Sequence, residues 1–182
     1  GAAVTITESV ASAVKSAAAK VRAGSSTATS SPTTSSSAYM ECLDIAGGQS
    51  ANWSIDKLRA AGISAVWSRA SDGVDWLDSG LAANVAQTCR IGAEPGAYHF
   101  LRVRHGRPQD GAEQGRQHAV AARAQGIRLA SWLDVERGPE NDPRFKDHNA
   151  ATREEWHAAI WDALEGIERE SGIAPLLYTY VA

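Results

Sequence analysis

The alternation of strand-like and helix-like segments is the feature that most limits the fold of this chain. Five short segments with strand patterning are expected at 41–45, 64–68, 92–100, 129–135 and 176–180. Helical patterns separate them, at 54–62, 78–89, 110–125 and 152–171. Repeated strand–helix–strand units form right-handed crossovers and a parallel sheet. The sequence therefore predicts an α/β fold, and both a parallel barrel and an open doubly wound sheet fit this pattern.

The chain divides near residue 38, where its composition changes. Residues 1–24 are rich in alanine, with apolar residues at helical spacing, and predict a helix. It is either a weakly stable surface helix or a tether that docks on a partner chain. Eleven of the thirteen residues from 25 to 37 are Ser or Thr, so segment 25–38 has too little to bury and is expected to be a linker. Residues 39–182 are expected to form the single globular domain.

Charge and cysteine content exclude several classes of protein. The net charge of −3 lacks the basic excess of a general nucleic-acid binder. No run of 18 apolar residues predicts a membrane span. Two cysteines cannot build a disulfide scaffold or a cysteine-ligated zinc cluster, and Cys42 is expected to pack as a small apolar side chain. We expect no metal and no cofactor, since His99 has no second His or Cys at ligand spacing.

The segment Ser131-Trp-Leu-Asp-Val-Glu136 carries the clearest chemical signal. Alternate residues of a strand share a face, so Asp134 and Glu136 are expected to point the same way, roughly 6–7 Å apart. They lie at the C-terminal end of a parallel strand, where α/β folds bind ligands. Two acids at this distance repel each other, so one can keep its proton near neutral pH while the other ionises. Glycoside hydrolysis needs such a pair.

Each of the other strands also brings a polar or aromatic residue to the predicted rim. These residues are Asp44, Asp72, Tyr98 with His99, and Tyr178 with Tyr180. Aromatic rings pack against the C–H faces of sugars, while carboxylates bind their hydroxyl groups. The sequence thus predicts a carbohydrate-binding cleft. A basic loop follows the third strand, with Arg102, Arg104, His105 and Arg107, and is either a solvated loop or a contact for an anionic wall polymer.

At these residues the sequence resembles the family 25 glycoside hydrolases, the Chalaropsis-type lysozymes. The family motifs D-x-S-x-x-Q-G, K-A-T-E-G, G-A-Y-H-F, L-D-x-E and Y-T-Y correspond here to DIAGGQS at 44–50, RASDG at 69–73, GAYHF at 96–100, LDVE at 133–136 and PLLYTY at 175–180. Asp78 and Asn84 also occur where the family has an Asp and an Asn. Order and spacing agree over residues 41–182.

The resemblance implies a (β/α)5(β)3 barrel that cleaves the β-1,4 bond between N-acetylmuramic acid and N-acetylglucosamine in peptidoglycan. Glu136 would be the general acid, and Asp134 its companion carboxylate, orienting the acetamido group of the substrate as the internal nucleophile. Asp44 would hold the sugar and tune the pair. The residues expected to contact substrate are Tyr98, His99, Tyr178, Asp72, Trp132 and Gln49.

The sequence also departs from the family pattern. Ala46 and Ser50 replace a Ser and a Gly of the opening motif, and the three closing strands of the barrel are missing after strand five. We therefore expect an incomplete barrel from a longer protein, located outside the cell, at the cell wall or on a virion. An alternative is a wall-binding or structural module of a phage particle with weak or no turnover. Residues 1–38 would then contact other subunits of that assembly.

Overall fold

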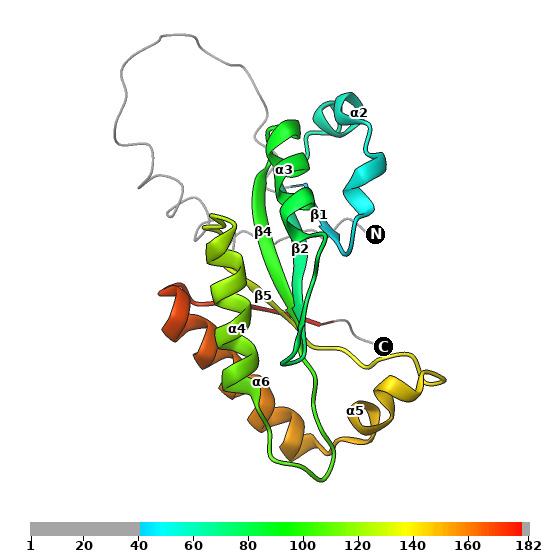
Figure 1. Ribbon diagram of the computed structural model, residues 1–182, viewed down its shortest axis with the longest axis vertical. Coiled ribbons are helices and arrows are strands. Elements are labelled where there is room, and N and C mark those ends of the chain that lie inside the picture. Colours follow the sequence, from blue (N-terminus) through cyan, green and yellow to red (C-terminus); the bar gives the residue numbers. More distant parts are fainter. Residues whose placement is uncertain (1–40, 180–182) are drawn as a thin grey trace.

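The computed structural model describes residues 41–179 of the chain (Figure 1). The helix expected over 1–24 and the linker expected over 25–38 lie outside these residues. Within them the structure is a curved parallel sheet with helices along its outer side (Figure 1).

The sheet contains five parallel strands in chain order. They are β1 (Cys42–Ile45), β2 (Ala65–Asp72), β4 (Glu94–Phe100), β5 (Trp132–Asp134) and β6 (Leu176–Tyr178), with the order β1-β2-β4-β5-β6. A doubly wound sheet would place β1 in the middle, whereas here it lies at an edge. The sequence prediction of an incomplete parallel barrel is confirmed. A short strand that the sequence analysis did not predict, β3 (Trp76–Leu77), pairs with β2 in antiparallel orientation.

Residues 41–179 contain the four helices expected from the sequence and three short helical segments that it did not predict, η1, η2 and α5. Their bounds are η1 (Gln49–Asn52), α2 (Ile55–Ala60), α3 (Leu81–Ile91), α4 (Gly111–Ala124), η2 (Pro143–Phe145), α5 (Lys146–Ala150) and α6 (Arg153–Ser171). The capping box of Thr152 and Glu155 starts α6, and Gly172 ends it in the left-handed conformation. The helix expected over 78–89 begins later than predicted, because Gly80 is the N-cap of α3 and Asp78 accepts a hydrogen bond from the Gly80 backbone N–H. No helix in the described residues could span a membrane.

Helices α4 and α6 pack backbone against backbone through small residues. A Cβ atom on Gly115 would lie 2.3 Å from the carbonyl oxygen of Ala163, and one on Gly111 would lie 2.3 Å from that of Ala159. Any larger side chain at these two glycines would force the helices apart. This contact holds α6 against α4 on the outer side of the sheet. It thereby helps to position the segment between β5 and α6.

The inner face of the sheet is built on stacked tryptophans. The rings of Trp67 on β2 and Trp132 on β5 stack with centroids 4.3 Å apart. Gly96 of β4 lies beneath them, and a Cβ atom there would come within 2.7 Å of the Trp67 ring, so only glycine leaves room for the stack. Cys42 packs in the same cluster, fully buried, as the sequence predicted. The apolar floor of the half-barrel supports the polar residues one layer above it.

Candidate functional site

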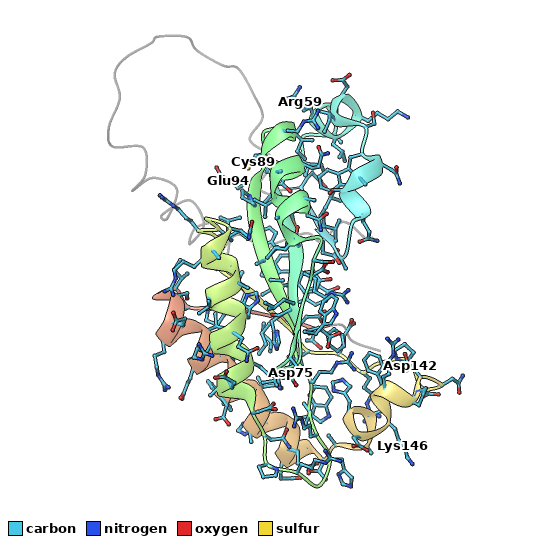
Figure 2. All side chains as sticks on the ribbon, in the orientation of Figure 1. Arg59, Asp75, Cys89, Glu94, Asp142 and Lys146 are labelled. Atoms are coloured by element: carbon cyan, nitrogen blue, oxygen red, sulfur yellow. The ribbon has the colours of Figure 1, made fainter. Side chains whose placement is uncertain are left out.

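The loops that follow the parallel strands gather at one end of the molecule. Figure 2 shows Glu94, at the start of β4, near one end of the sheet, and Asp75 and Asp142, in the loops after β2 and β5, at the other. Asp44, Tyr98 and the later part of β5 lie toward this second end. This is the end at which α/β barrels bind their ligands.

Asp134 ends β5 and is buried, with a side-chain oxygen (Oδ1) that has no hydrogen-bond partner among the described residues. Burial, together with the negative charges of Glu136 and Asp44, raises its pKa to about 7. An unpartnered, buried carboxyl oxygen is costly to charge, so this group holds a proton near neutral pH. It is the most strongly perturbed acid of the described chain, in a position that faces the interior of the half-barrel.

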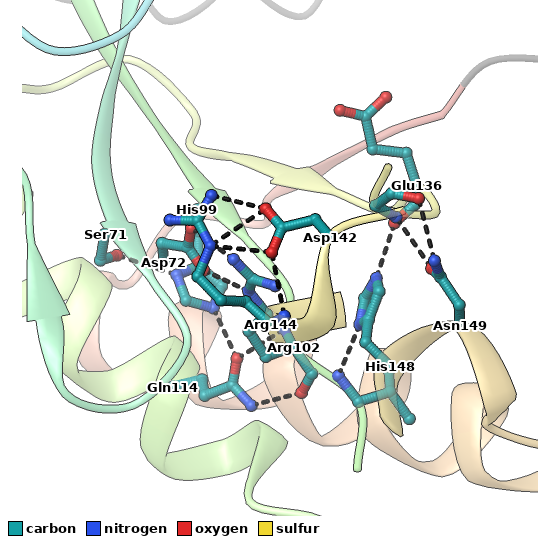
Figure 3. Close-up of polar contacts among 12 residues, drawn as sticks. Ser71, Asp72, His99, Arg102, Gln114, Glu136, Asp142, Arg144, His148 and Asn149 are labelled. Atoms are coloured by element: carbon teal, nitrogen blue, oxygen red, sulfur yellow. Dashed lines mark hydrogen bonds and ion pairs between the residues drawn. The ribbon is translucent and has the colours of Figure 1, made fainter. Parts of the chain in front are cut away.

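Glu136 lies two residues beyond the end of β5 and is half-buried. Its backbone carbonyl is fixed by His148, while its side chain points away from His148 and Asn149 (Figure 3). Burial and the charge of Asp44 raise the pKa of its carboxyl group. The two acids and Asp44 therefore form one electrostatic group in which ionisation of one member opposes ionisation of the others.

Five of the residues singled out by the sequence line the same hollow. They are Asp44, Tyr98, Trp132, Asp134 and Tyr178. The Tyr178 ring stacks on Trp132 with centroids 5.6 Å apart, extending the stack that begins at Trp67. The hollow measures only about 10 Å³, so it marks where these side chains converge, and a sugar ring would lie over it. Residues from β1, β4, β5 and β6 therefore meet at one place, as the sequence predicted.

Gln49 lies in a neighbouring cavity of about 380 Å³ that it shares with Asp44 and Tyr98. Its side-chain oxygen accepts a hydrogen bond of 2.6 Å from the backbone N–H of Ala46. Gln49 is exposed, and its amide group lies beside the first strand.

The structure does not bring His99 into the cleft. Because Tyr98 and His99 are consecutive on β4, they face opposite sides of the sheet, and His99 is fully buried toward α4. Its ring nitrogens contact Ser71 at 2.8 Å and Gln114 at 3.0 Å. Burial lowers the pKa of His99 to about 4, so the ring is neutral. It belongs to the buried polar contacts between sheet and helix.

Asp72 reaches the inner side of the sheet through a bulge in β2. The register of β2 against β4 shifts between Arg69 and Ser71, so Asp72 regains the face of Arg69. There its carboxylate accepts two hydrogen bonds from the guanidinium group of Arg102, at 2.5 and 3.0 Å (Figure 3). Asp72 lies close enough to raise the pKa of Asp134, but its oxygens are already occupied by Arg102.

Two positioning residues, Asp78 and Asn84, were not assigned a role by the sequence analysis. Asp78 accepts a hydrogen bond from the backbone N–H of Gly47 at 2.8 Å and pairs with Arg69 at 3.3 Å. Asn84 donates to the carbonyl oxygen of Gly47 at 2.6 Å. Together they clamp the loop that follows Asp44. The matching Asp and Asn in the family pattern were the only sequence signal for this role.

No group of three or more His, Cys, Asp and Glu side chains within residues 41–179 is arranged to hold a metal ion. The site as described consists of carboxylates, aromatic rings and one amide. Such a set can bind sugar hydroxyl groups, donate a proton and stabilise positive charge that develops on a sugar ring.

Comparisons with known proteins agree with this geometry. The sequence model of glycosyl hydrolases family 25 matches residues 43–182. A muramidase structure from Acremonium alcalophilum is similar, with a TM-score of 0.57, 20% identity, and coverage of 74% of this chain and 62% of the other. No curated protein matches.

Two further solved structures share the fold. A bacterial lysozyme from Streptomyces coelicolor has a TM-score of 0.58 at 18% identity, over 76% of this chain and 62% of the other. The catalytic domain of endolysin ply40, from a bacteriophage of Listeria monocytogenes, has a TM-score of 0.55 at 18% identity, over 75% and 61%. The chain therefore spans about 62% of the length of the first structures it matches.

Proposed function

The chain belongs to glycosyl hydrolases family 25, and from this membership we propose that it is a muramidase. The reaction is hydrolysis of the β-1,4 bond between N-acetylmuramic acid and N-acetylglucosamine in peptidoglycan. The observation that carries the proposal is the acid pair at the end of β5. Burial and the charges of Glu136 and Asp44 raise the pKa of Asp134, and burial and the charge of Asp44 raise that of Glu136, so the pair keeps a proton near neutral pH.

Glu136 is the general acid in this proposal. Its half-buried side chain lies close enough to Asp134 and Asp44 to interact with both electrostatically, and in this proposal it protonates the oxygen of the leaving sugar. Asp134 lies deeper, where its free oxygen can accept a hydrogen bond from the acetamido N–H of the substrate. That contact would position the acetamido oxygen to attack the anomeric carbon as the glycosidic bond breaks.

Substrate binding also decides which acid holds the proton. In the free protein Asp134 has the pKa of about 7 and competes for the proton of the pair. An N–H donor from the sugar favours the ionised form of Asp134, because a hydrogen bond to a carboxylate stabilises its charge. The proton then resides on Glu136, where protonation of the leaving oxygen requires it.

The remaining residues of the hollow bind the sugar. Tyr98 and Tyr178 provide rings and hydroxyl groups beside Asp134, and Asp44 provides a carboxylate for sugar hydroxyls. Gln49 contacts the adjoining unit from its cavity. Trp132 is buried under Tyr178 and supports the platform from below.

This activity would operate on the cell wall, outside the cell or from a virion, with peptidoglycan as the partner. Residues 39–182 form the catalytic domain in this proposal, and residues 1–38 would connect it to other parts of the protein or assembly. A context bound to a phage particle is one form of this proposal. A wall-binding module without turnover is the competing function.

The test measures new reducing ends released from purified cell walls. Wild-type protein should release them, and Glu136→Gln should lower the rate about 10²-fold or more, because it keeps the shape of the side chain without a proton to donate. Asp134→Asn should also lose activity. Glu140→Gln is the matched control, since Glu140 is exposed in the same loop. Wall binding with no release by wild type would favour the binding module, and a fast Glu136→Gln protein would place the acid elsewhere.

A further inference from the structure

A hollow larger than the two described above lies next to the acid pair and is not used by the chemistry proposed above. It measures about 730 Å³ and is formed by the loops that follow β2, β4 and β5. Five arginines line it, namely Arg69, Arg102, Arg104, Arg107 and Arg144. We call this hollow the arginine groove.

The charge of the arginine groove is opposite to that of the domain. Its lining contains five arginines and three aspartates, Asp72, Asp75 and Asp147. Residues 41–179 as a whole contain 15 basic and 20 acidic residues. One third of the basic residues therefore lines one hollow in an acidic domain, which creates a local attraction for anions.

Carboxylates outside the groove hold three of its arginines in place. The pairs are Arg69 with Asp78 at 3.3 Å, Arg104 with Asp110 at 2.7 Å, and Arg144 with Asp142 at 2.6 Å. A guanidinium group has five N–H donors, and one carboxylate engages at most two of them. These pairs orient the arginines while leaving N–H groups available to a ligand.

Arg107 and Arg102 differ strongly in their exposure to solvent. Arg107 is 65% exposed, and its nearest carboxylate, Asp147, is 4.0 Å away and equally exposed. Such a pair contributes little and leaves the charge accessible. Arg102 is less exposed, with its guanidinium group 3.7 Å from the centre of the Phe145 ring. It donates two hydrogen bonds to Asp72 (Figure 3).

The arginine groove borders the proposed catalytic site. Arg69 and Asp72 line the groove, and both act electrostatically on Asp134. A group attached to a sugar bound over Asp134 would therefore extend into the groove. In peptidoglycan the muramic acid unit carries a peptide with free carboxylates, attached through its lactyl group. The muramic acid unit at the cleaved bond thus carries carboxylates that the arginine groove could bind.

We propose that the arginine groove binds the carboxylates of the stem peptide on the muramic acid unit, so that the protein prefers glycan with its peptides attached. This inference rests on the proposed function and adds a specificity site to it. Guanidinium groups bind carboxylates through paired, charge-assisted hydrogen bonds. Arg107 and Arg144 are the residues with the greatest access to such a ligand, since both side chains are mostly exposed.

The experiment compares two soluble tetrasaccharides of alternating N-acetylglucosamine and N-acetylmuramic acid, one with stem peptides and one stripped by an amidase. Calorimetry gives each Kd in a Glu136→Gln background, which prevents turnover. The peptide-bearing form should bind about tenfold more tightly, as expected for one charged hydrogen-bonding contact. Arg107→Ala with Arg144→Ala should abolish this preference. Arg128→Ala, an exposed arginine outside the groove, should retain it.

Equal affinity for the two tetrasaccharides, or a preference that survives loss of both arginines, would overturn the inference. Oligomers of glycerol phosphate serve as a second probe. Their binding through Arg107, without a preference for stem peptides, would assign the groove to phosphodiester polymers and also overturn it. The proposed function is tested separately, by release of reducing ends from peptide-free glycan by protein that retains Glu136. Absence of reducing ends in that assay would contradict the proposed function, whereas absence of a preference for stem peptides would contradict only the inference about the arginine groove.

Discussion

His148 donates a hydrogen bond from its Nε2 atom to the backbone carbonyl oxygen of Glu136, over 2.9 Å. Its Nδ1 atom accepts one from the backbone N–H of Val103, over 3.1 Å, which fixes the tautomer of the ring. The ring is buried between Phe145 and Trp156, and burial lowers its pKa, so it remains neutral. His148 therefore links the backbone of Glu136, the proposed acid, to the backbone of the loop that follows β4.

This relationship makes His148 a positioning residue. His148→Phe keeps the ring in its aromatic surroundings but removes both hydrogen bonds, so Glu136 should lose its fixed position. We expect kcat to fall about tenfold with KM within twofold, because a misplaced acid affects the transition state more than binding. His148→Gln, which can both donate and accept, should recover part of kcat. Steady-state kinetics on wall glycan checks both.

The control for His148 is His157→Phe, the same exchange at an exposed position of α6. It should leave kcat unchanged. Urea unfolding of each variant separates positioning from stability. If His148→Phe were fully folded and as active as wild type, His148 would have no role in placing Glu136.

The acid pair should give a bell-shaped dependence of kcat/KM on pH. The active form carries one proton, and the pKa of Asp134 is raised to about 7, so activity should persist below pH 7 and fall above it. Asp44→Asn removes a negative charge that raises the pKa of both acids. The alkaline limb should therefore move to lower pH in this variant. An unchanged limb, or a shift to higher pH, would contradict the coupling between Asp44 and the pair.

Asp134 should also make the protein less stable at neutral pH than at acidic pH. Its pKa is 3.8 in the unfolded chain and about 7 in the folded one, so folding becomes less favourable as the pH rises between these values. Asp134→Asn removes this penalty. Its Tm should exceed that of wild type by roughly 5 °C at pH 8 and equal it near pH 4. A Tm difference that does not vary with pH would show that Asp134 ionises freely.

Because α4 and α6 are in close contact, we expect one added methyl group between them to lower the stability of the protein strongly. Gly115→Ala would place its Cβ atom 2.3 Å from the carbonyl oxygen of Ala163, so the two helices must separate. We expect a loss of about 2 kcal/mol or more in the free energy of unfolding, measured with urea. Gly48→Ala is the control, because a Cβ atom there meets nothing within 4 Å. Equal stability of the two variants would rule out the tight packing.

The local features of this protein were set by the sequence. Apolar segments of strand length alternate with helical patterns, the capping box of Thr152 and Glu155 starts α6, and Gly172 ends it. These signals depend only on residues a few positions apart, which is why they predicted a parallel sheet with most elements in place. The sequence analysis assigned both Tyr98 and His99 to the cleft, although consecutive strand residues face opposite sides, and the structure shows that His99 is buried on the other face of β4.

Only the tertiary structure decided how distant segments meet. The bulge in β2 turns Asp72 inward to Arg102, thirty residues further along. Asp78 and Asn84 hold Gly47 across 31 and 37 residues, and three separate loops form the arginine groove. The pKa of Asp134 follows from its burial and from charges brought near it by folding. Sequence patterns report local periodicity, whereas desolvation and charge coupling depend on which distant groups the folded chain places within a few ångströms of each other.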